Sequence, residues 1–223
     1  MNTATLVYDV ETVGPFNAPL VYDIGGAYLT PDGRVEHEFH FCIKEVFSNL
    51  KLMATAYYAE NFGTYLQSIR SGDIRLVPFS TATYIINDLA KLHDVQAQAA
   101  YNLTFDKRAM EHTAETLTGN PKWLERDLKE ICIMCAACDV LYDKLYCQLA
   151  RARGWVTPKG NIKTTAECGY RFVSGDYDFQ EAHMGLNDVQ AEIEIFRAVE
   201  ATGKPYDGTP RAFPFRQVWK REG

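Results

Sequence analysis

The sequence has no apolar run long enough to cross a membrane. Its longest unbroken apolar segment covers residues 131–138, whereas a membrane-spanning helix needs about 20 such residues. The N-terminus has no basic start and reaches its first charge at Asp9, which does not fit a secretory signal. We therefore expect a cytoplasmic protein with no membrane partner.

The sequence also lacks the cysteine and glycine patterns of common cofactor sites. No glycine-rich phosphate loop carries a lysine, so P-loop nucleotide hydrolysis is not predicted. Six cysteines occur at irregular spacing, and three of them form the motif Cys132-x-x-Cys135-x-x-Cys138. A ferredoxin-type cluster needs a further cysteine followed by proline, but Cys147 is followed by Gln148. We expect buried free thiols, and a zinc or iron–sulfur site is the alternative.

The chain has no overall excess of basic residues. Its 23 Lys and Arg are outnumbered by 29 Asp and Glu, giving a net charge of −6, which disfavours a general polyanion-binding surface. Two segments depart from this balance. Residues 151–171 hold five basic residues and one acidic residue, and residues 211–223 hold four and one. Both contain aromatic residues, so local binding of a single strand is expected, with a solvated face as the alternative.

The length and composition predict one α/β domain over residues 1–223, with a short basic and aromatic tail from about residue 204. Early strands followed by a strand set among helices indicate a mixed sheet covered by helices, whose first three strands are antiparallel. The turn signal Pro31-Asp-Gly33 favours a hairpin. Strands are predicted over 5–10, 20–29, 34–43 and 96–101; helices over 57–70, 81–92, from 102 to about 119, over most of 128–153, shortly after Pro158-Lys-Gly160, and over 187–201.

Two acidic residues, Asp9 and Glu11, stand two apart at the end of the first predicted strand. They project from the same face of that strand, where two carboxylates repel each other unless a cation lies between them. A hard divalent cation with oxygen ligands is the usual solution. A solvated strand end is the alternative that this pair alone leaves open.

Asp106, Asp188 and His183 are further candidates. Asp106 falls where a strand gives way to a helix, although the helix dipole alone favours an acidic residue there. Asp188 begins the apolar stripe of the last long helix, so it faces the interior. His183 precedes that helix near a glycine and could act as a proton acceptor. Taken alone, it is better interpreted as a surface histidine or one with satisfied hydrogen bonds.

These residues resemble the active-site pattern of the DEDDh, or DnaQ-like, 3′–5′ exonucleases. The resemblance rests on Asp9-Val-Glu-Thr12, on Asn102-Leu-Thr-Phe-Asp106, and on His183 five positions before Asp188, and it covers nearly the whole chain. One departure is Tyr101, where many members have histidine. The run from Thr157 to Thr164 is similar to segments of phage-encoded members, whose site of action would be the host cytoplasm.

The resemblance implies a ribonuclease H-like fold with a mixed five-stranded sheet, and hydrolysis with two Mg²⁺ or Mn²⁺ ions about 3.5–4 Å apart. Asp9 would bridge the ions, Glu11 and Asp188 would complete the first, and Asp106 would hold the second. His183 would deprotonate the attacking water. The implied substrate-binding residues are Thr12, Asn102 and Phe105.

The predicted function is a stand-alone 3′–5′ exonuclease that shortens single-stranded nucleic acid from its 3′ end, with DNA favoured over RNA. Little sequence follows the last helix, which leaves no room for a polymerase domain, although the chain could join a polymerase or replication complex as a subunit. Three alternatives remain: an exoribonuclease related to oligoribonuclease, an endonuclease, and a non-catalytic nucleic-acid-binding subunit.

Overall fold

The computed structural model describes residues 3–221, so Glu222 of the expected basic tail lies outside the described residues. The chain forms two compact units. The first contains residues up to 98, 104–129 and 182–189, and the second contains 99–103, 130–181 and the residues from 190 onward. No helix in the described part is long and apolar enough to cross a membrane.

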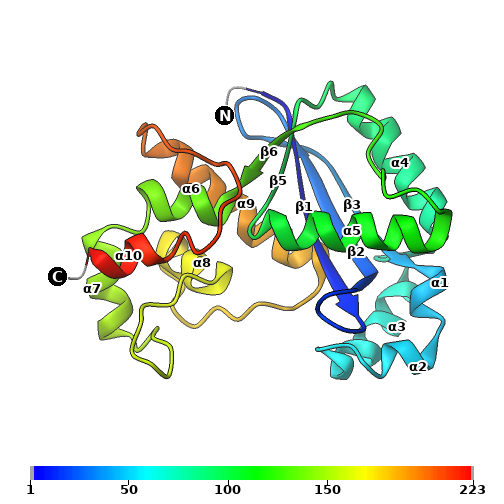
Figure 1. The fold of residues 1–223 in the computed structure, drawn as a ribbon, viewed down its shortest axis with the longest axis horizontal. Coiled ribbons are helices and arrows are strands. Elements are labelled where there is room, and N and C mark those ends of the chain that lie inside the picture. Colours follow the sequence, from blue (N-terminus) through cyan, green and yellow to red (C-terminus); the bar gives the residue numbers. More distant parts are fainter. Residues whose placement is uncertain (1–2, 222–223) are drawn as a thin grey trace. The chain divides into compact units, whose positions relative to one another are not determined.

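Six strands form one mixed sheet in the order β4-β3-β2-β1-β5-β6 (Figure 1). The strands are β1 (Thr5–Val13), β2 (Leu20–Leu29), β3 (Val35–Ile43), β4 (Arg75–Val77), β5 (Ala97–Ala100) and β6 (Lys129–Cys132). The first three are antiparallel, and β4 runs parallel to β3. This confirms the predicted α/β class, with one strand more than expected. The three residues of β4 are too few to show a periodic pattern, and β6 lies in a stretch that was predicted to be helical.

The antiparallel register brings particular residues of β1, β2 and β3 together. Asp9 pairs with Gly25 and Glu11 pairs with Asp23 across β1 and β2, while Gly25 pairs with His40 across β2 and β3. A register shift follows Glu11. The central strand β2 is buried from its second residue to its last, so the carboxylate-bearing end of β1 stands against an almost wholly buried neighbour.

The helices of the first unit follow β3, β4 and β5. They are α1 (Lys44–Phe47), α2 (Leu50–Met53), the 3₁₀ turn η1 (Ala59–Asn61), α3 (Phe62–Ser71), α4 (Phe79–Leu92) and α5 (Leu103–Thr118), whose first residue belongs to the second unit. Side-chain hydrogen bonds join two of these helices to β2. The Tyr28 hydroxyl donates to the Ile86 carbonyl in α4 at 2.7 Å, and the Thr113 hydroxyl in α5 accepts from the Val21 amide at 2.9 Å.

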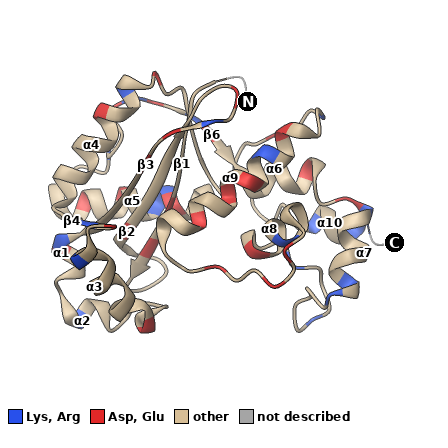
Figure 2. Cartoon of the chain, turned by 180° about the vertical axis from the view of Figure 1, so that it is seen from behind, with Lys and Arg blue, Asp and Glu red and all other residues tan. Residues whose placement is uncertain are grey.

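The remaining helices are α6 (Ile133–Val140), α7 (Lys144–Ala152), α8 (Ala166–Ser174), α9 (Gly185–Ala201), whose first turn belongs to the first unit, and α10 (Arg216–Lys220). The helix predicted over most of 128–153 is wrong in part, because β6 replaces its beginning and a break separates α6 from α7. Asp143 explains the new start, since its side chain accepts from the amides of Leu145 and Tyr146 and so caps α7. Basic positions, blue in Figure 2, mark both ends of α7.

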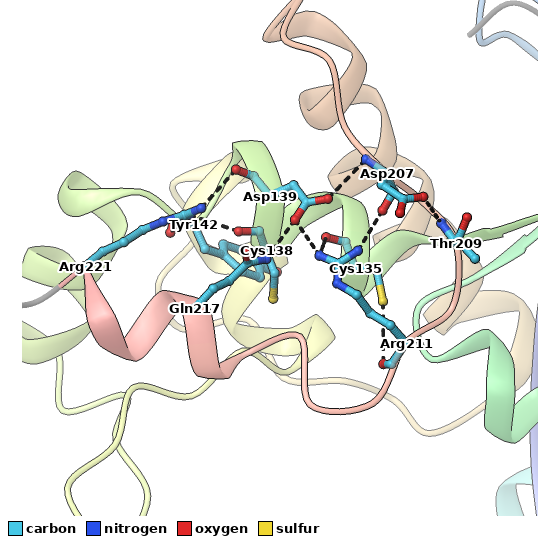
Figure 3. Close-up of polar contacts among 9 residues, drawn as sticks. All are labelled: Cys135, Cys138, Asp139, Tyr142, Asp207, Thr209, Arg211, Gln217 and Arg221. Atoms are coloured by element: carbon cyan, nitrogen blue, oxygen red, sulfur yellow. Dashed lines mark hydrogen bonds and ion pairs between the residues drawn. The ribbon is translucent and has the colours of Figure 1, made fainter.

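The C-terminal tail is fixed within the second unit by two arginines (Figure 3). Arg211 contacts the Asp139 carboxylate and the Cys135 carbonyl, and Arg221 donates to the carbonyls of Cys138, Asp139 and Tyr142. Two of the four basic side chains of residues 211–223 therefore make polar contacts within the second unit. All six cysteines are free and buried, which confirms the expectation of buried thiols.

Candidate active site

Two glycines let the beginning of α9 lie directly against β2. A Cβ atom on Gly25 would fall 2.0 Å from the Leu186 nitrogen, and one on Gly185 would fall 2.5 Å from the Gly25 nitrogen and 3.2 Å from the Asp9 carbonyl oxygen. Neither position leaves room for a side chain. This contact sets the first turn of α9, which carries Asp188, beside the acidic end of β1.

Glu11, His183 and Asp188 come together as a group that could hold a metal ion. Each offers one ligand atom, and the three atoms lie within 4.8 Å of one another. Glu11 and His183 are half-buried and Asp188 is buried. Among the residues that the structure describes, this is the one such group of histidine, cysteine and acidic side chains. The first and the last of the sequence motifs thus meet within a single unit.

Asp188 has one carboxylate oxygen that is buried and unmatched. Its Oδ2 accepts from the Met184 amide at 3.0 Å, whereas its Oδ1 has no hydrogen-bond partner among residues 3–221. Burial raises the pKa of Asp188 to about 7, and the nearby charge of Asp23 adds to this rise. A buried carboxylate oxygen without a donor lowers the stability of the folded state unless a cation is bound. This oxygen therefore suits a divalent metal.

Asp106 lies in the first turn of α5 and is only 4% exposed. Burial raises its pKa to about 7, and a hydrogen bond from the Val10 amide works against that rise. The amide contact places the Asp106 carboxylate against β1, between Asp9 and Glu11 in sequence. Asp9 itself is half-buried at that end of the strand. Asp9 and Asp106 are therefore associated with the same end of β1 as Glu11, although the group within 4.8 Å contains only Glu11 and Asp188 of the four carboxylates. Carboxylate oxygens suit Mg²⁺ or Mn²⁺.

His183 is held in an unusual backbone conformation. Its φ of 51° falls in the left-handed region that residues other than glycine rarely adopt. Its ring stacks on Tyr58, with centroids 3.7 Å apart and planes inclined by 9°. Its carbonyl accepts from the Asn61 side chain at 3.3 Å. The histidine is therefore positioned by contacts on both its ring and its backbone.

An exposed aromatic platform lies just after β1. Phe16 is 75% exposed and stacks on Phe105 in α5, with ring centroids 5.8 Å apart. The Arg108 guanidinium lies over the Phe16 ring at 4.7 Å and donates to the Phe16 carbonyl at 3.1 Å. One of the predicted substrate-binding residues, Phe105, thus belongs to a surface on which a planar ring could stack.

The other predicted substrate residues are less closely tied to this group. Thr12 is half-buried beyond the register shift of β1, and Asn102 is exposed in the second unit, at the turn before α5. The departure at Tyr101 has a structural explanation. Its hydroxyl lies 2.6 Å from the Tyr142 hydroxyl and donates to the Thr164 carbonyl at 2.7 Å, so it is part of the interior of the second unit.

Comparison with known proteins found similarity in structure but not in sequence. No protein-family model and no curated protein matches the chain. An E. coli exonuclease I bound to single-stranded DNA and zinc superposes with a TM-score of 0.60 at 16% identity, over 90% of this chain and 41% of that one. A product-bound exonuclease I gives 0.58 at 16% identity, over 90% and 44%.

The chain shares the fold of exonuclease I. A third exonuclease I structure, with a TM-score of 0.55 at 15% identity, agrees over 88% of this chain and 41% of that one. The ribonuclease H-like fold is thereby confirmed, and the chain spans about two fifths of the length of the exonuclease I structures.

The residues that support the site through contacts with the turn before α9 were not predicted from the sequence. Asp23, Tyr58 and Tyr65 carried no motif. The pair Gly25-Gly26 did offer a signal, because glycine inside a strand often marks a close backbone approach. Asp23 offered a second one, as the one acidic residue in an otherwise apolar and glycine-containing strand.

Proposed function

We propose that this protein is a metal-dependent 3′–5′ exonuclease that removes nucleoside 5′-monophosphates from single-stranded DNA. The observation that carries the proposal is the group of Glu11, His183 and Asp188, whose ligand atoms lie within 4.8 Å of one another on the fold of exonuclease I. DNA is favoured over RNA because single-stranded DNA is what that exonuclease I structure contains.

In this proposal the four carboxylates hold the cations. Asp9, Glu11 and Asp188 would hold one ion, and Asp9 and Asp106 a second. The ions, when bound, supply positive charge that offsets the carboxylates and the developing charge on the phosphate oxygens. The unmatched Oδ1 of Asp188 supports this assignment, since it is a buried acceptor with no donor among the described residues.

His183 would act as the general base and take a proton from the attacking water. A histidine is suited to this role because its usual pKa lies near neutral pH. Its position within reach of Glu11 and Asp188 supports the role, and its ring lies flat against Tyr58. The water would attack the phosphorus atom, and the bond to the 3′ oxygen of the preceding nucleotide would break.

The platform of Phe16, Phe105 and Arg108 would receive the end of the strand. A base can stack on an exposed ring regardless of its identity, and Phe16 presents such a ring. The guanidinium of Arg108 would contribute positive charge near the phosphates. Thr12 would add a polar contact, and Asn102 stays a predicted substrate residue of the second unit. We further expect action in the cytoplasm, that of the host for a phage-encoded chain, alone or as a subunit of a replication complex.

The test uses single-stranded DNA and RNA oligonucleotides labelled at either the 5′ or the 3′ end, with Mg²⁺, Mn²⁺ or EDTA. We expect 5′-labelled DNA to shorten stepwise in metal, 3′-labelled DNA to release a labelled mononucleotide at once, and EDTA to stop both reactions. Asp188→Asn should reduce the rate by about 10³-fold or more, as expected for a residue of the reacting site.

The matched control is Asp178→Asn, which changes an exposed aspartate outside the candidate site and should leave the rate unchanged. Cleavage in EDTA, or full activity in Asp188→Asn, would overturn the proposal. Faster loss of RNA than of DNA would instead identify an exoribonuclease.

A further inference from the structure

A fully buried aspartate on β2, Asp23, lies behind the candidate site and contacts the segment that carries His183. We propose that Asp23 is a positioning residue for the general base, which fixes the turn before α9 and so holds His183 toward Glu11 and Asp188. This inference rests on the proposed function, because it assigns a part of the machinery of the same site.

Asp23 has no exposed surface and several polar neighbours. Its Oδ2 accepts from the Tyr65 hydroxyl at 2.7 Å and from the Gly185 amide at 2.9 Å. Its Oδ1 lies 2.9 Å from His40 Nε2, within contact distance but without the angles of a hydrogen bond. A buried carboxylate with this many polar contacts is fixed in place, because rotating it would leave buried donors without an acceptor.

The contact with Gly185 matters because α9 has no capping residue of its own at its start. The residues just before it, Ala182, His183 and Met184, have no side chain of the type that usually accepts from the first amides of a helix. Asp23, on β2, accepts a hydrogen bond from the Gly185 amide. Asp188, within α9 itself, accepts one from the Met184 amide. The start of α9 is therefore held by the sheet, through Asp23, as well as by Asp188 of the helix itself.

The same network reaches the backbone of His183. The Tyr65 hydroxyl, which donates to Asp23, lies 3.4 Å from the His183 carbonyl oxygen. Asn61 donates to the carbonyls of both Ala182 and His183, at 3.1 and 3.3 Å. A left-handed φ at a histidine persists only where the surroundings enforce it, and these contacts act directly on that backbone. Removing Asp23 would release the turn, and the imidazole would lose its fixed place.

The test compares Asp23→Leu, which removes both acceptor oxygens, with Asp23→Asn, whose amide oxygen can still accept from Tyr65 and Gly185. We expect Asp23→Leu to lower kcat by about 10- to 100-fold, with little change in KM or in Mn²⁺ affinity. Asp23→Asn should recover most of the rate. A second readout is independent of activity. The imidazole proton resonances of His183, assigned with His183→Gln, should carry the ring-current shift of Tyr58 in the wild type and lose it in Asp23→Leu.

The matched control is Asn87→Leu. Asn87 is another buried polar residue of the first unit, bonded to Trp123 and Glu125; this variant should lose stability while keeping kcat per folded molecule and the His183 resonances. The proposal is overturned if Asp23→Leu keeps the wild-type kcat, or if Asp23→Leu and Asn87→Leu lose the same share of kcat. If Asp23→Leu does not fold, Tyr65→Phe decides the matter by the same two readouts. A wild type without nuclease activity would count against the proposed function alone, since the resonance test still judges the positioning.

Discussion

Two aspartates, Asp23 in the first unit and Asp139 in the second, are each the centre of a polar network. Asp23 accepts from Tyr65 and Gly185 and is fully buried. Asp139 accepts from Gln217 at 2.7 Å and contacts Arg211, and its side chain is 19% exposed (Figure 3). A hydrogen-bonded aspartate therefore holds a different segment in each unit. In the first unit it holds the turn that carries a candidate catalytic histidine, and in the second it holds the C-terminal tail.

The two regions differ most in how their negative charge is balanced. Asp139 has an arginine as its direct partner. In the candidate site, by contrast, neither Asp106 nor Asp188 has a lysine or arginine partner within residues 3–221, and burial raises the pKa of both to about 7. Asp23 itself lies against His40. A paired carboxylate is typical of a structural contact, whereas buried carboxylates without a cation indicate a site that awaits one.

The largest effect is expected where the turn before α9 meets β2. Gly25→Ala would place a methyl group 2.0 Å from the Leu186 nitrogen and 2.1 Å from the Gly185 carbonyl carbon, and these backbone atoms leave it no space. We expect α9 to be displaced, the rate to fall by about 100-fold or more, and the free energy of unfolding to fall by about 1–3 kcal/mol. Oligonucleotide hydrolysis and thermal unfolding measure the two effects.

Gly63→Ala in α3 is the control, because nothing lies within 4 Å of the added methyl group. It should keep the rate and gain up to about 1 kcal/mol, since alanine favours a helix over glycine. Equal activity of Gly25→Ala and the wild type would mean that the close approach does not set the site.

A smaller effect, on how stability depends on pH and Mg²⁺, should distinguish Asp106 and Asp188 of the candidate site from Asp139. Unfolded aspartate has a pKa of about 4, so between about pH 4 and 7 the folded state binds more protons than the unfolded state at Asp106 and Asp188. The metal-free protein therefore loses stability from these groups as pH rises through that window. Mg²⁺ binds their ionised forms, so it should raise Tm more at pH 8 than at pH 5.

The measurement is thermal unfolding in Mg²⁺ or EDTA at both pH values. Glu11 and His183, the other ionisable members of the group, are present in all samples. Asp188→Asn should reduce the Mg²⁺ effect, whereas Asp139→Asn should preserve it even if it lowers Tm in both buffers. An equal rise in Tm at pH 5 and pH 8 would argue against carboxylate ligation.

The contrast between the regions also explains what the sequence could predict. Asp9, Glu11, Asp106, His183 and Asp188 could be named as candidates because metal and proton chemistry needs those residue types, and because their order resembles the DEDDh exonuclease pattern. The elements that carry them, β1, the start of α5 and α9, follow from strong local patterns. The fold class could be predicted for the same reason.

The roles of the supporting residues could not be predicted, because they arise from tertiary contacts, even though Gly25-Gly26 and Asp23 stand out in the strand sequence. Asp23 reaches Gly185 across 162 positions of sequence, and no local pattern encodes such a pair. The break between α6 and α7 is a smaller case, where the Asp143 cap ends a run that composition alone predicts as helix. Likewise, the basic tail suggested a binding surface, whereas Arg211 and Arg221 bond to residues of the second unit through tertiary contacts that the sequence does not encode.

The finest comparison removes a single donor from each network. Tyr65→Phe takes one hydrogen bond from Asp23, and Gln217→Ala takes one from Asp139. Each should lower the free energy of unfolding by about 0.5–1.5 kcal/mol, the usual net contribution of one hydrogen bond. Only Tyr65→Phe should also lower kcat, by about three- to tenfold, because its hydroxyl holds both Asp23 and the turn of His183. Chemical denaturation and initial rates on one oligonucleotide measure both quantities. If the two variants lose equal stability and neither loses rate, the Asp23 network is structural in the same sense as that of Asp139, and the distinction between the two regions disappears.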